Sequence, residues 1–279
     1  MRIAIVIPIH NEEAHLPTML DSLLSQSFLP ETVVLVNDHS TDGSQKIIDE
    51  YASQHSCIQT ISLESSAQHE PGSKVINAFY KGYALLKGDF DLIGKFDADL
   101  ILPSNYFENM AALFQSSPKI GLAGGNLYIE KEGVWVYENI SEKTKVRGPI
   151  KLYRKACFEA IGGLKKSIGW DTVDGLLASY HGWQSATDTT LHVKHLKPTG
   201  QQYASKDAKK QGEAFRKMRY GFWLTFIAAG KLALKKGRIS YFFGCINSFL
   251  KTPKDYIVTQ QEGAFIRSLR WKGIRKKVF

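Results

Sequence analysis

The sequence predicts an α/β fold in which a mostly parallel central sheet is flanked by helices, followed by a basic helical extension. Apolar, β-branched runs of strand length alternate with helix-length segments over residues 1–100, and such alternation is typical of right-handed βαβ units. Positive charge gathers toward the other end of the chain. Residues 206–279 hold 18 Lys and Arg against 4 Asp and Glu, a net charge of +14, whereas residues 1–205 carry a net charge of −5.

The N-terminal half begins with a buried strand. Ile3–Ile9 is a continuous apolar run, as expected where both faces of a strand are covered. The run contains Pro8 and ends in polar residues without a small-residue cleavage site, so we interpret it as a strand rather than as a signal peptide. The further strands expected before residue 100 are Thr32–Val36, Ile58–Leu63 and Leu92–Phe96, and the expected helices span residues 12–26, 44–54 and 73–86.

Residues 101–205 combine shorter apolar runs with glycine turns. Two of these runs are close enough in sequence to pair as a hairpin. The elements expected here are a strand end and turn at Gly121–Gly125, paired strands at Leu127–Ile129 and Val134–Tyr137, a helix over Asp171–Ser179 and extended chain over Ala186–His195.

The C-terminal segment predicts helices that lie on a membrane surface. Its apolar stretch Gly221–Gly230 is far shorter than the ~20 residues that a spanning helix needs. A later apolar stripe at helical spacing is flanked by Lys and Arg, a pattern that suits a helix in a membrane interface. The stripe consists of Ile239, Phe242, Phe243, Ile246 and Leu250. Residues 206–279 are therefore predicted to hold a cytoplasmic protein peripherally on the inner face of a membrane.

Composition narrows the class of protein. The chain is 43% hydrophobic and 11% aromatic, which excludes a disordered chain. Its three cysteines, Cys57, Cys157 and Cys245, are scattered and predict a reducing compartment rather than a disulfide framework. Nucleic acid is not expected as the partner of the basic tail, because the tail's aromatic residues lie in apolar stripes and are not interleaved with basic residues.

Polar clusters follow three of the expected strands. They are His10-Asn11-Glu12, the segment Asp38–Ser44, and Asp97-Ala98-Asp99. Ligands bind beyond the carboxyl ends of the strands in open α/β sheets. The three clusters are therefore predicted to converge on one edge of the sheet.

Two of these clusters carry acids whose chemistry can be read from their positions. Asp97 and Asp99 are two residues apart, so both carboxylates can point to one side of an extended chain and meet one cation. Oxygen ligands of this kind suit Mg²⁺ or Mn²⁺, although two solvated acids are the plainer interpretation. Asp38 can accept hydrogen bonds from a base or ribose, while its neighbours Ser40, Thr41 or Asp42 can cap the next helix.

The order and spacing of these motifs resemble family 2 of the inverting glycosyltransferases. The resemblance rests on Pro8-x-His10-Asn11-Glu12-Glu13, Asn37-Asp38-x-Ser40-x-Asp42-Gly43, Asp97-x-Asp99 and, less strictly, Gly72-Ser73-Lys74-x-x-Asn77-Ala78. It implies a GT-A fold, a divalent metal and a nucleoside-diphosphate sugar donor, with UDP as the first choice and GDP and dTDP open. The donor-binding residues that it implies are Pro8, His10, Asn11, Glu12, Asp38, Lys74, Asp97, Ala98 and Asp99.

The same resemblance implies a catalytic base and a third metal ligand. Asp171 matches the carboxylate that acts as the general base in the family. Trp170 stands where the family usually has Glu, and Asp174 is the alternative base. His195 resembles the family's late histidine near the metal, although a packed histidine is the plainer interpretation. A base is also required on chemical grounds, since the acceptor hydroxyl must lose its proton in an inverting transfer. An N-cap role is the alternative for Asp171.

Acceptor contacts are the weakest part of this prediction. Trp170 can stack on a sugar face, Asp174 lies one helical turn after Asp171, and Arg154 can meet phosphate or acceptor. Core packing for Trp170 and a solvated surface position for Arg154 are the plainer interpretations.

Taken together, the sequence predicts a metal-dependent glycosyltransferase domain over residues 1–205 and a membrane-associated tail over residues 206–279. Residues 1–100 form the nucleotide-sugar half and residues 101–205 the acceptor half. The acceptor is expected to be a glycan or a lipid-linked glycan. The alternatives are a nucleotidyltransferase on a similar sheet, a non-catalytic scaffold of the same fold, and a nucleic-acid-binding protein that uses the basic tail.

Overall fold

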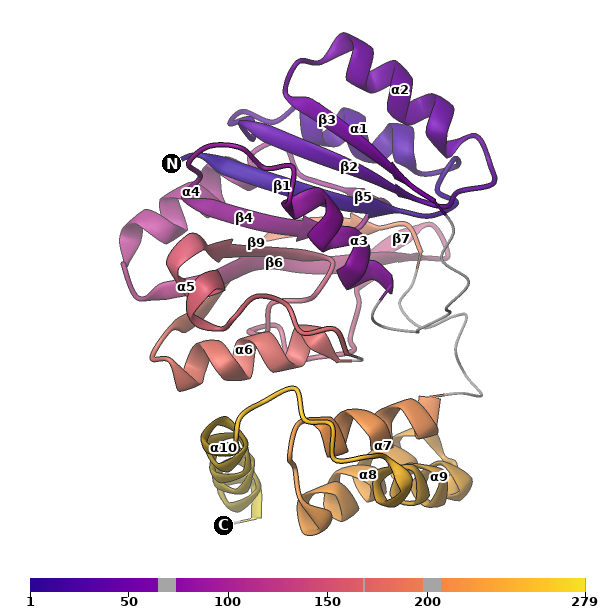
Figure 1. Cartoon of the computed structure of the whole chain (residues 1–279), viewed down its shortest axis with the longest axis vertical. Helices are drawn as coiled ribbons and strands as arrows, with labels where there is room; N and C mark the ends of the chain where they lie inside the picture. Colours follow the sequence, from indigo (N-terminus) through magenta and orange to yellow (C-terminus); the bar gives the residue numbers. More distant parts are fainter. Residues whose placement is uncertain (65–73, 168, 198–206, 279) are drawn as a thin grey trace. The chain divides into compact units, whose positions relative to one another are not determined.

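The computed structural model describes residues 1–64, 74–167, 169–197 and 207–278 (Figure 1). Contacts within the chain divide it into two compact units. Unit 1 comprises Met1–Leu164 and His181–Pro198, and unit 2 comprises Lys165–Tyr180 and Thr199–Phe279. Residues 165–180 thus belong by their contacts to the C-terminal unit, whereas the sequence placed them in the acceptor half of the first domain.

Unit 1 is built on a large mixed sheet. Its strands are β1 (Ile3–Ile9), β2 (Thr32–Asp38), β3 (Ile58–Leu63), β4 (Leu92–Phe96), β5 (Leu100–Ile101), β6 (Ile120–Lys131), β7 (Val134–Tyr137), β8 (Ile150–Arg154) and β9 (Gln184–His195). Within the described residues the order is β3-β2-β1-β4-β8-β6-β9-β5, with β7 paired to β6. The first four strands in this order are parallel, and β8 runs antiparallel to both of its neighbours.

The predicted α/β fold is therefore confirmed. β1, β3 and β4 have the bounds expected from the sequence, and β6 and β7 form the expected antiparallel pair. Order along the sheet is not the order along the chain: β4 pairs with β1, and β9 inserts beside β6.

Helices cover both faces of this sheet. They are α1 (Leu16–Leu24), α2 (Ser44–Gln54), α3 (Lys74–Tyr83), α4 (Tyr106–Ser116) and α5 (Lys155–Ala160). Odd-numbered residues of β1, such as Ile5 and Ile7, are fully buried in one core with residues of α1 and α4. The opposite face of the sheet receives α3, which lies in front of it in Figure 1. Alternation of side chains across a strand explains why β1 is apolar throughout.

α3 approaches the sheet so closely that it needs a glycine. A Cβ added to Gly82 would lie 2.6 Å from side-chain carbons of both Val6 and Val36. Because real Cβ contacts are not this short, only glycine allows α3 this close to β1 and β2.

The predicted first helix begins later than the sequence pattern indicated. Residues 12 and 13 belong to the loop that precedes it, since the Glu12 N–H donates to Ser44 Oγ at 2.9 Å and the Glu13 N–H donates to Asp42 Oδ2 at 3.1 Å. α1 starts at Leu16 and has Pro17 in its first turn, where the missing N–H of proline costs no helical hydrogen bond.

Unit 2 is helical over its described residues. Its helices are α6 (Trp170–Tyr180), α7 (Asp207–Lys217), α8 (Phe222–Lys236), α9 (Ile239–Lys251) and α10 (Gln260–Val278). α7 crosses α9 at Gly212, where an added Cβ would lie 2.8 Å from the Phe249 backbone nitrogen. α6 is attached to α10, since the Tyr180 hydroxyl donates to Gln261 Oε1 at 3.3 Å and its ring contacts Phe265.

The apolar stripe expected over residues 239–250 lies on a helix, but it is not the buried face of that helix. α9 buries Tyr241, Cys245 and Phe249, whereas Ile239, Phe243 and Leu250 are 72%, 64% and 60% exposed. None of the helices in the described part of the chain has both the length and the apolar character required to cross a bilayer.

Candidate active site

Two loops interlock at the carboxyl ends of β1 and β2. Asn11 connects them twice: its Oδ1 accepts the Thr41 N–H at 2.7 Å, and its own N–H donates to Ser40 Oγ at 3.0 Å. Glu13 adds a third link, because its carboxylate accepts the Gly43 N–H at 2.9 Å. Asn11 has φ 55°, a left-handed conformation that Asn tolerates better than most residues. The predicted convergence of these two polar clusters is confirmed.

The donor residues predicted here line the rim that this loop pair forms. His10 places its Nδ1 2.6 Å from the Asp38 carbonyl oxygen. Asp38 holds His39 through a 2.7 Å contact between Oδ1 and Nδ1. Asp38 does not cap α2, because Asp42 Oδ1 accepts the Ser44 N–H that begins this helix. The Asp38 carboxylate therefore stays at the strand end, where the sequence placed a base or ribose contact.

Glu12, in the loop after β1, interacts with the two acids Asp97 and Asp99 that follow the neighbouring strand β4. Burial raises its pKa above the ordinary range, a bond from Lys197 Nζ to its Oε2 at 2.6 Å opposes this shift, and repulsion from Asp99 and Asp97 adds to it. The charge of Glu12, in the loop after β1, is therefore coupled to the charges of the two acids after β4.

The remaining predicted donor residues lie nearby in the fold. Pro8 is a half-buried residue of β1, Ala98 is buried between the two acids, and Lys74 is the first residue of α3. Gly72 and Ser73, which belong to the same motif as Lys74, lie outside the described residues.

Asp97, Asp99 and His195 form one cluster. Each offers a ligand atom, and these atoms lie within 4.8 Å of one another. The sheet brings them together, because β5 pairs with β9 so that Leu100 lies opposite His195, next to Asp99. His195 Nε2 lies 3.5 Å from Asp99 Oδ2. Asp97 is the more accessible acid, and Lys95 from the preceding strand donates to its Oδ1.

Glu138 is a member of this cluster that the sequence did not reveal. It is 2% exposed, and its Oε2 lies 3.3 Å from His195 Nδ1 and 3.3 Å from Arg147 Nη2. Its only sequence signal is its place as an acid directly after β7, as Asp97 is directly after β4. Glu138 holds one ring nitrogen of His195, so the other nitrogen is directed at Asp99.

The two carboxylates around His195 control its protonation. Burial alone would lower the pKa of His195, but the hydrogen bonds that its protonated ring donates to Asp99 and Glu138 outweigh burial and raise the pKa to about 9. The cluster therefore attracts positive charge at Nε2, where a proton or a cation can be shared with Asp99. Two carboxylates and an imidazole held by a further carboxylate are a donor set that fits Mn²⁺ or Mg²⁺.

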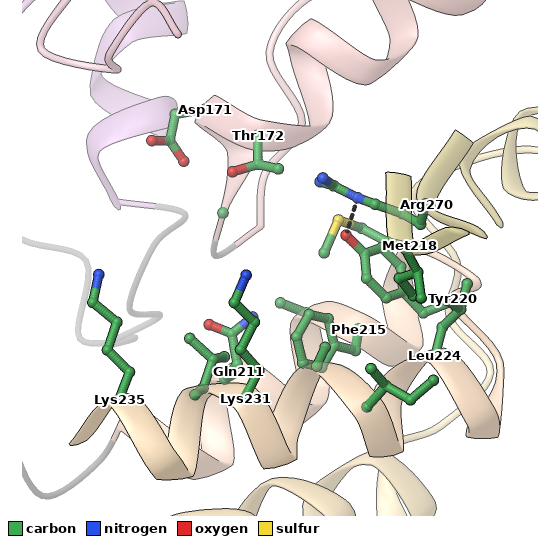
Figure 2. A pocket seen from close by; sticks show the side chains of 16 residues that line it. Asp171, Thr172, Gln211, Phe215, Met218, Tyr220, Leu224, Lys231, Lys235 and Arg270 are labelled. Carbon is green, nitrogen blue, oxygen red and sulfur yellow. Dashed lines mark hydrogen bonds between the residues drawn. The ribbon is translucent and has the colours of Figure 1, made fainter. Parts of the chain in front are cut away.

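Unit 2 contains the residues predicted for the base and part of the acceptor site. Asp171 lies in the first turn of α6 and is partly exposed, and Trp170 begins this helix and is partly exposed as well. Asp174 is only 1% exposed, so it is a poorer base for a bound hydroxyl than Asp171. Asp171 and Thr172 lie at the edge of a pocket formed within unit 2 (Figure 2).

Arg154 has a role in the fold that the sequence did not indicate. It stands opposite Leu92, at the end of β4 remote from Asp97. Its guanidinium donates to the carbonyls of Ile120, Phe114 and Ser117 at 3.0, 2.6 and 3.2 Å, closing the C-terminal end of α4. We therefore leave Arg154 out of the acceptor site.

A family comparison agrees with this fold. The family model described as "Glycosyl transferase family 2" matches residues 4–165. The chain belongs to glycosyl transferase family 2. An uncharacterized glycosyltransferase of Mycoplasma pneumoniae is 26% identical over 268 residues, a match that covers 90% of this chain and 83% of that protein. The next two curated relatives are longer proteins, of which the matches cover 27% and 45%.

Solved structures show the same GT-A fold. S. aureus TarS 1–349 in complex with UDP-GlcNAc is 16% identical with a TM-score of 0.58, over 90% of this chain and 72% of that chain. The mannosyltransferase PcManGT from Pyrobaculum calidifontis, solved with GDP-Man and Mn²⁺, is 14% identical with a TM-score of 0.55, over 100% of this chain and 81% of that chain. At these identities the likeness concerns the fold.

Proposed function

We propose that this glycosyltransferase is metal-dependent and inverting, and that it moves a sugar from a UDP-sugar to a hydroxyl of a glycan or lipid-linked acceptor. The observation that carries the proposal is the cluster of Asp97, Asp99 and His195 at the strand ends, beside the interlocked loops of β1 and β2. The solved relatives add support, because their names record UDP-GlcNAc in one and GDP-Man with Mn²⁺ in the other.

In this proposal the sugar donor lies along the carboxyl ends of β1, β2 and β4. Asp38 accepts hydrogen bonds from the ribose or base, and Asn11 keeps the two loops in register. Asp97, Asp99 and His195 would hold Mn²⁺ or Mg²⁺, which when bound offsets negative charge on the donor diphosphate. Glu138 fixes the ring of His195, a contribution typical of the carboxylates that surround metal ligands.

Asp171 acts as the base. In a single displacement the acceptor oxygen forms a bond to the anomeric carbon while the bond to the diphosphate breaks and its electron pair leaves with the diphosphate. The acceptor hydroxyl gives its proton to the Asp171 carboxylate in this step, and the configuration at the anomeric carbon is inverted. Asp171 suits this role because it is accessible at the start of α6, whereas Asp174 is buried.

A thermal-shift screen tests the donor site directly. UDP, GDP, dTDP and CDP are each added with and without Mn²⁺, and a ligand that binds only the native state raises Tm. UDP with Mn²⁺ is expected to raise Tm by several degrees, and either one alone by much less. A folded protein that no nucleotide stabilises, with or without the metal, would contradict the proposal.

We also propose that unit 2 attaches the protein to the inner face of a membrane. Aromatic rings of α8 and α9 form one continuous surface cluster, linked by the Phe226–Phe242 pair with ring centroids 5.0 Å apart. The cluster consists of Phe222, Trp223, Phe226, Phe242 and Phe243. Trp223 and Phe243 are 69% and 64% exposed. Exposed aromatic side chains on basic helices suit the interface of an anionic bilayer.

The double variant Trp223→Ser/Phe243→Ser is expected to bind vesicles of anionic lipid on the order of 10²-fold more weakly, since two large apolar side chains no longer enter the interface. Vesicle sedimentation measures this. Leu29→Ser is the control, because Leu29 is an exposed apolar residue of unit 1, at 51%. Vesicle binding that stays the same in the double variant would refute the attachment.

A further inference from the structure

Unit 2 contains a pocket of about 580 Å³ that is lined entirely by residues of this unit (Figure 2). α6, α7, α8 and α10 all contribute to it. Much of the wall is apolar, including Phe215, Met218, Leu224, Ile227 and Leu232. A volume of this size holds a medium-sized organic group, and apolar walls favour an occupant with a hydrocarbon part.

Positive charge stands on one side of this pocket. Lys231 and Lys235 lie one turn apart on α8, and both are exposed. Figure 2 shows both side chains extending away from the α8 backbone, toward the side of the pocket where Asp171 and Thr172 lie. Two like charges at this spacing repel each other on a helix. An anion that contacts both ammonium groups would relieve the repulsion and add charge-assisted hydrogen bonds.

A third cation is fixed in the wall. Arg270 donates from Nε to the Tyr220 hydroxyl at 2.9 Å, which holds its guanidinium beside the apolar residues. Asp171 is the one acidic side chain among the described residues that line the pocket. The pocket thus combines an apolar wall, cationic side chains and the accessible carboxylate at the start of α6.

We propose that this pocket binds the lipid phosphate portion of the acceptor, and that the acceptor is a glycan or hydroxyl-bearing group carried on a single-chain lipid phosphate. The hydrocarbon chain packs against the apolar wall, and the phosphate contacts Lys231 and Lys235. The group to be glycosylated then lies at the Asp171 edge. The inference rests on the proposed function, because it takes Asp171 as the base.

Two other kinds of ligand fit the apolar wall of this pocket less well. A free oligosaccharide would bury hydroxyl groups against apolar side chains without hydrogen-bond partners, which is unfavourable. A bilayer surface is the second. In the attachment proposed above it contacts the exposed aromatic cluster of α8 and α9, and none of the five residues of that cluster lines this pocket. A concave apolar site with cations on one side fits one lipid chain that ends in phosphate.

Calorimetry of the full chain tests the proposal, with farnesyl phosphate below its micelle concentration as the probe. Farnesol and inorganic phosphate are the comparison ligands. Farnesyl phosphate is expected to bind roughly tenfold or more tightly than farnesol, because farnesol lacks the charged contacts, and inorganic phosphate should show no saturable binding. Equal affinities for farnesyl phosphate and farnesol would overturn the assignment of the lysines.

Variants locate the binding in this pocket. Ala228→Trp fills it, and Lys231→Glu/Lys235→Glu reverses the charge on one side. Each should weaken farnesyl phosphate binding by roughly tenfold or more. The matched controls are Ala264→Trp and Lys272→Glu, at exposed positions of α10 that do not line the pocket. Folded pocket variants that bind farnesyl phosphate as the wild type does would overturn the proposal.

The donor screen separates this inference from the proposed function. A wild-type protein that is stabilised by UDP and Mn²⁺ but does not bind farnesyl phosphate would overturn the lipid phosphate pocket alone. A protein that binds farnesyl phosphate in this pocket but no nucleotide would support the pocket and contradict the glycosyl transfer.

Discussion

Replacing Asp99 with Ala is expected to lower both sugar transfer and donor hydrolysis by on the order of 10²- to 10³-fold or more, the cost of removing a group that stabilises charge at a reacting centre. Asp99 is 7% exposed and faces His195 Nε2 at 3.5 Å, so its carboxylate is central to the predicted metal cluster. In Asp99→Ala the rise in Tm with UDP and Mn²⁺ should disappear together with the activity. In Asp97→Asn most of this rise in Tm should disappear as well.

A matched control separates the cluster from general effects of charge. Asp89→Ala removes a carboxylate of unit 1 whose side chain is 78% exposed and forms long ion pairs with Arg2 and Lys155. This variant should keep the activity and the nucleotide response. If Asp99→Ala is folded and transfers sugar at the normal rate, Asp99 does not hold a metal that the reaction needs.

The variant Asp171→Asn is expected to lose transfer by roughly 10²- to 10⁴-fold, the usual contribution of a positioned general base. Asparagine keeps the shape of the side chain but cannot take the acceptor proton. The thermal shift with UDP and Mn²⁺ should stay as in the wild type, and so should the binding of farnesyl phosphate. Transfer is measured with a UDP-sugar and an acceptor at saturating concentration.

Two further variants make this prediction specific. Asp255→Asn changes an exposed acid of unit 2 and should leave transfer intact. Asp174→Asn changes a buried acid, so its main effect should be a lower Tm. Loss of nucleotide binding in Asp171→Asn would show that Asp171 does not act simply as a base. Full transfer activity in that variant would assign the base to another residue.

The sequence predicted the part of the fold in which periodicity is strong. Ile3–Ile9 and Leu92–Phe96 are uninterrupted apolar runs, and both are strands with the expected bounds. The start of α1 was predicted too early, because Glu12 and Glu13 are good helix formers whose N–H groups are bonded to Ser44, the first residue of α2, and to Asp42 in the loop before it. A pattern of neighbouring residues cannot predict hydrogen bonds between groups that are 32 and 29 residues apart in the chain.

The buried face of α9 illustrates a second limit. An apolar helical stripe is predicted by the pattern Ile239, Phe242, Phe243, Ile246 and Leu250, and the helix is present. The structure buries Tyr241, Cys245 and Phe249, which are apolar residues of α9 outside this stripe, and leaves Ile239, Phe243 and Leu250 of the stripe exposed. A helix that is apolar on more than one face does not identify its packing partner by periodicity alone.

The sequence by itself determined the fold class, the family and the acids at the ends of β2 and β4, because strand length, spacing and motif order are local properties of the chain. Tertiary structure alone decided which distant residues complete the site. Glu138 meets His195, and a pocket forms from four helical segments, because strand pairing and helix packing bring together residues far apart in sequence. The same packing buried Asp174 and left Asp171 accessible, a difference that burial creates between two acids on one helix.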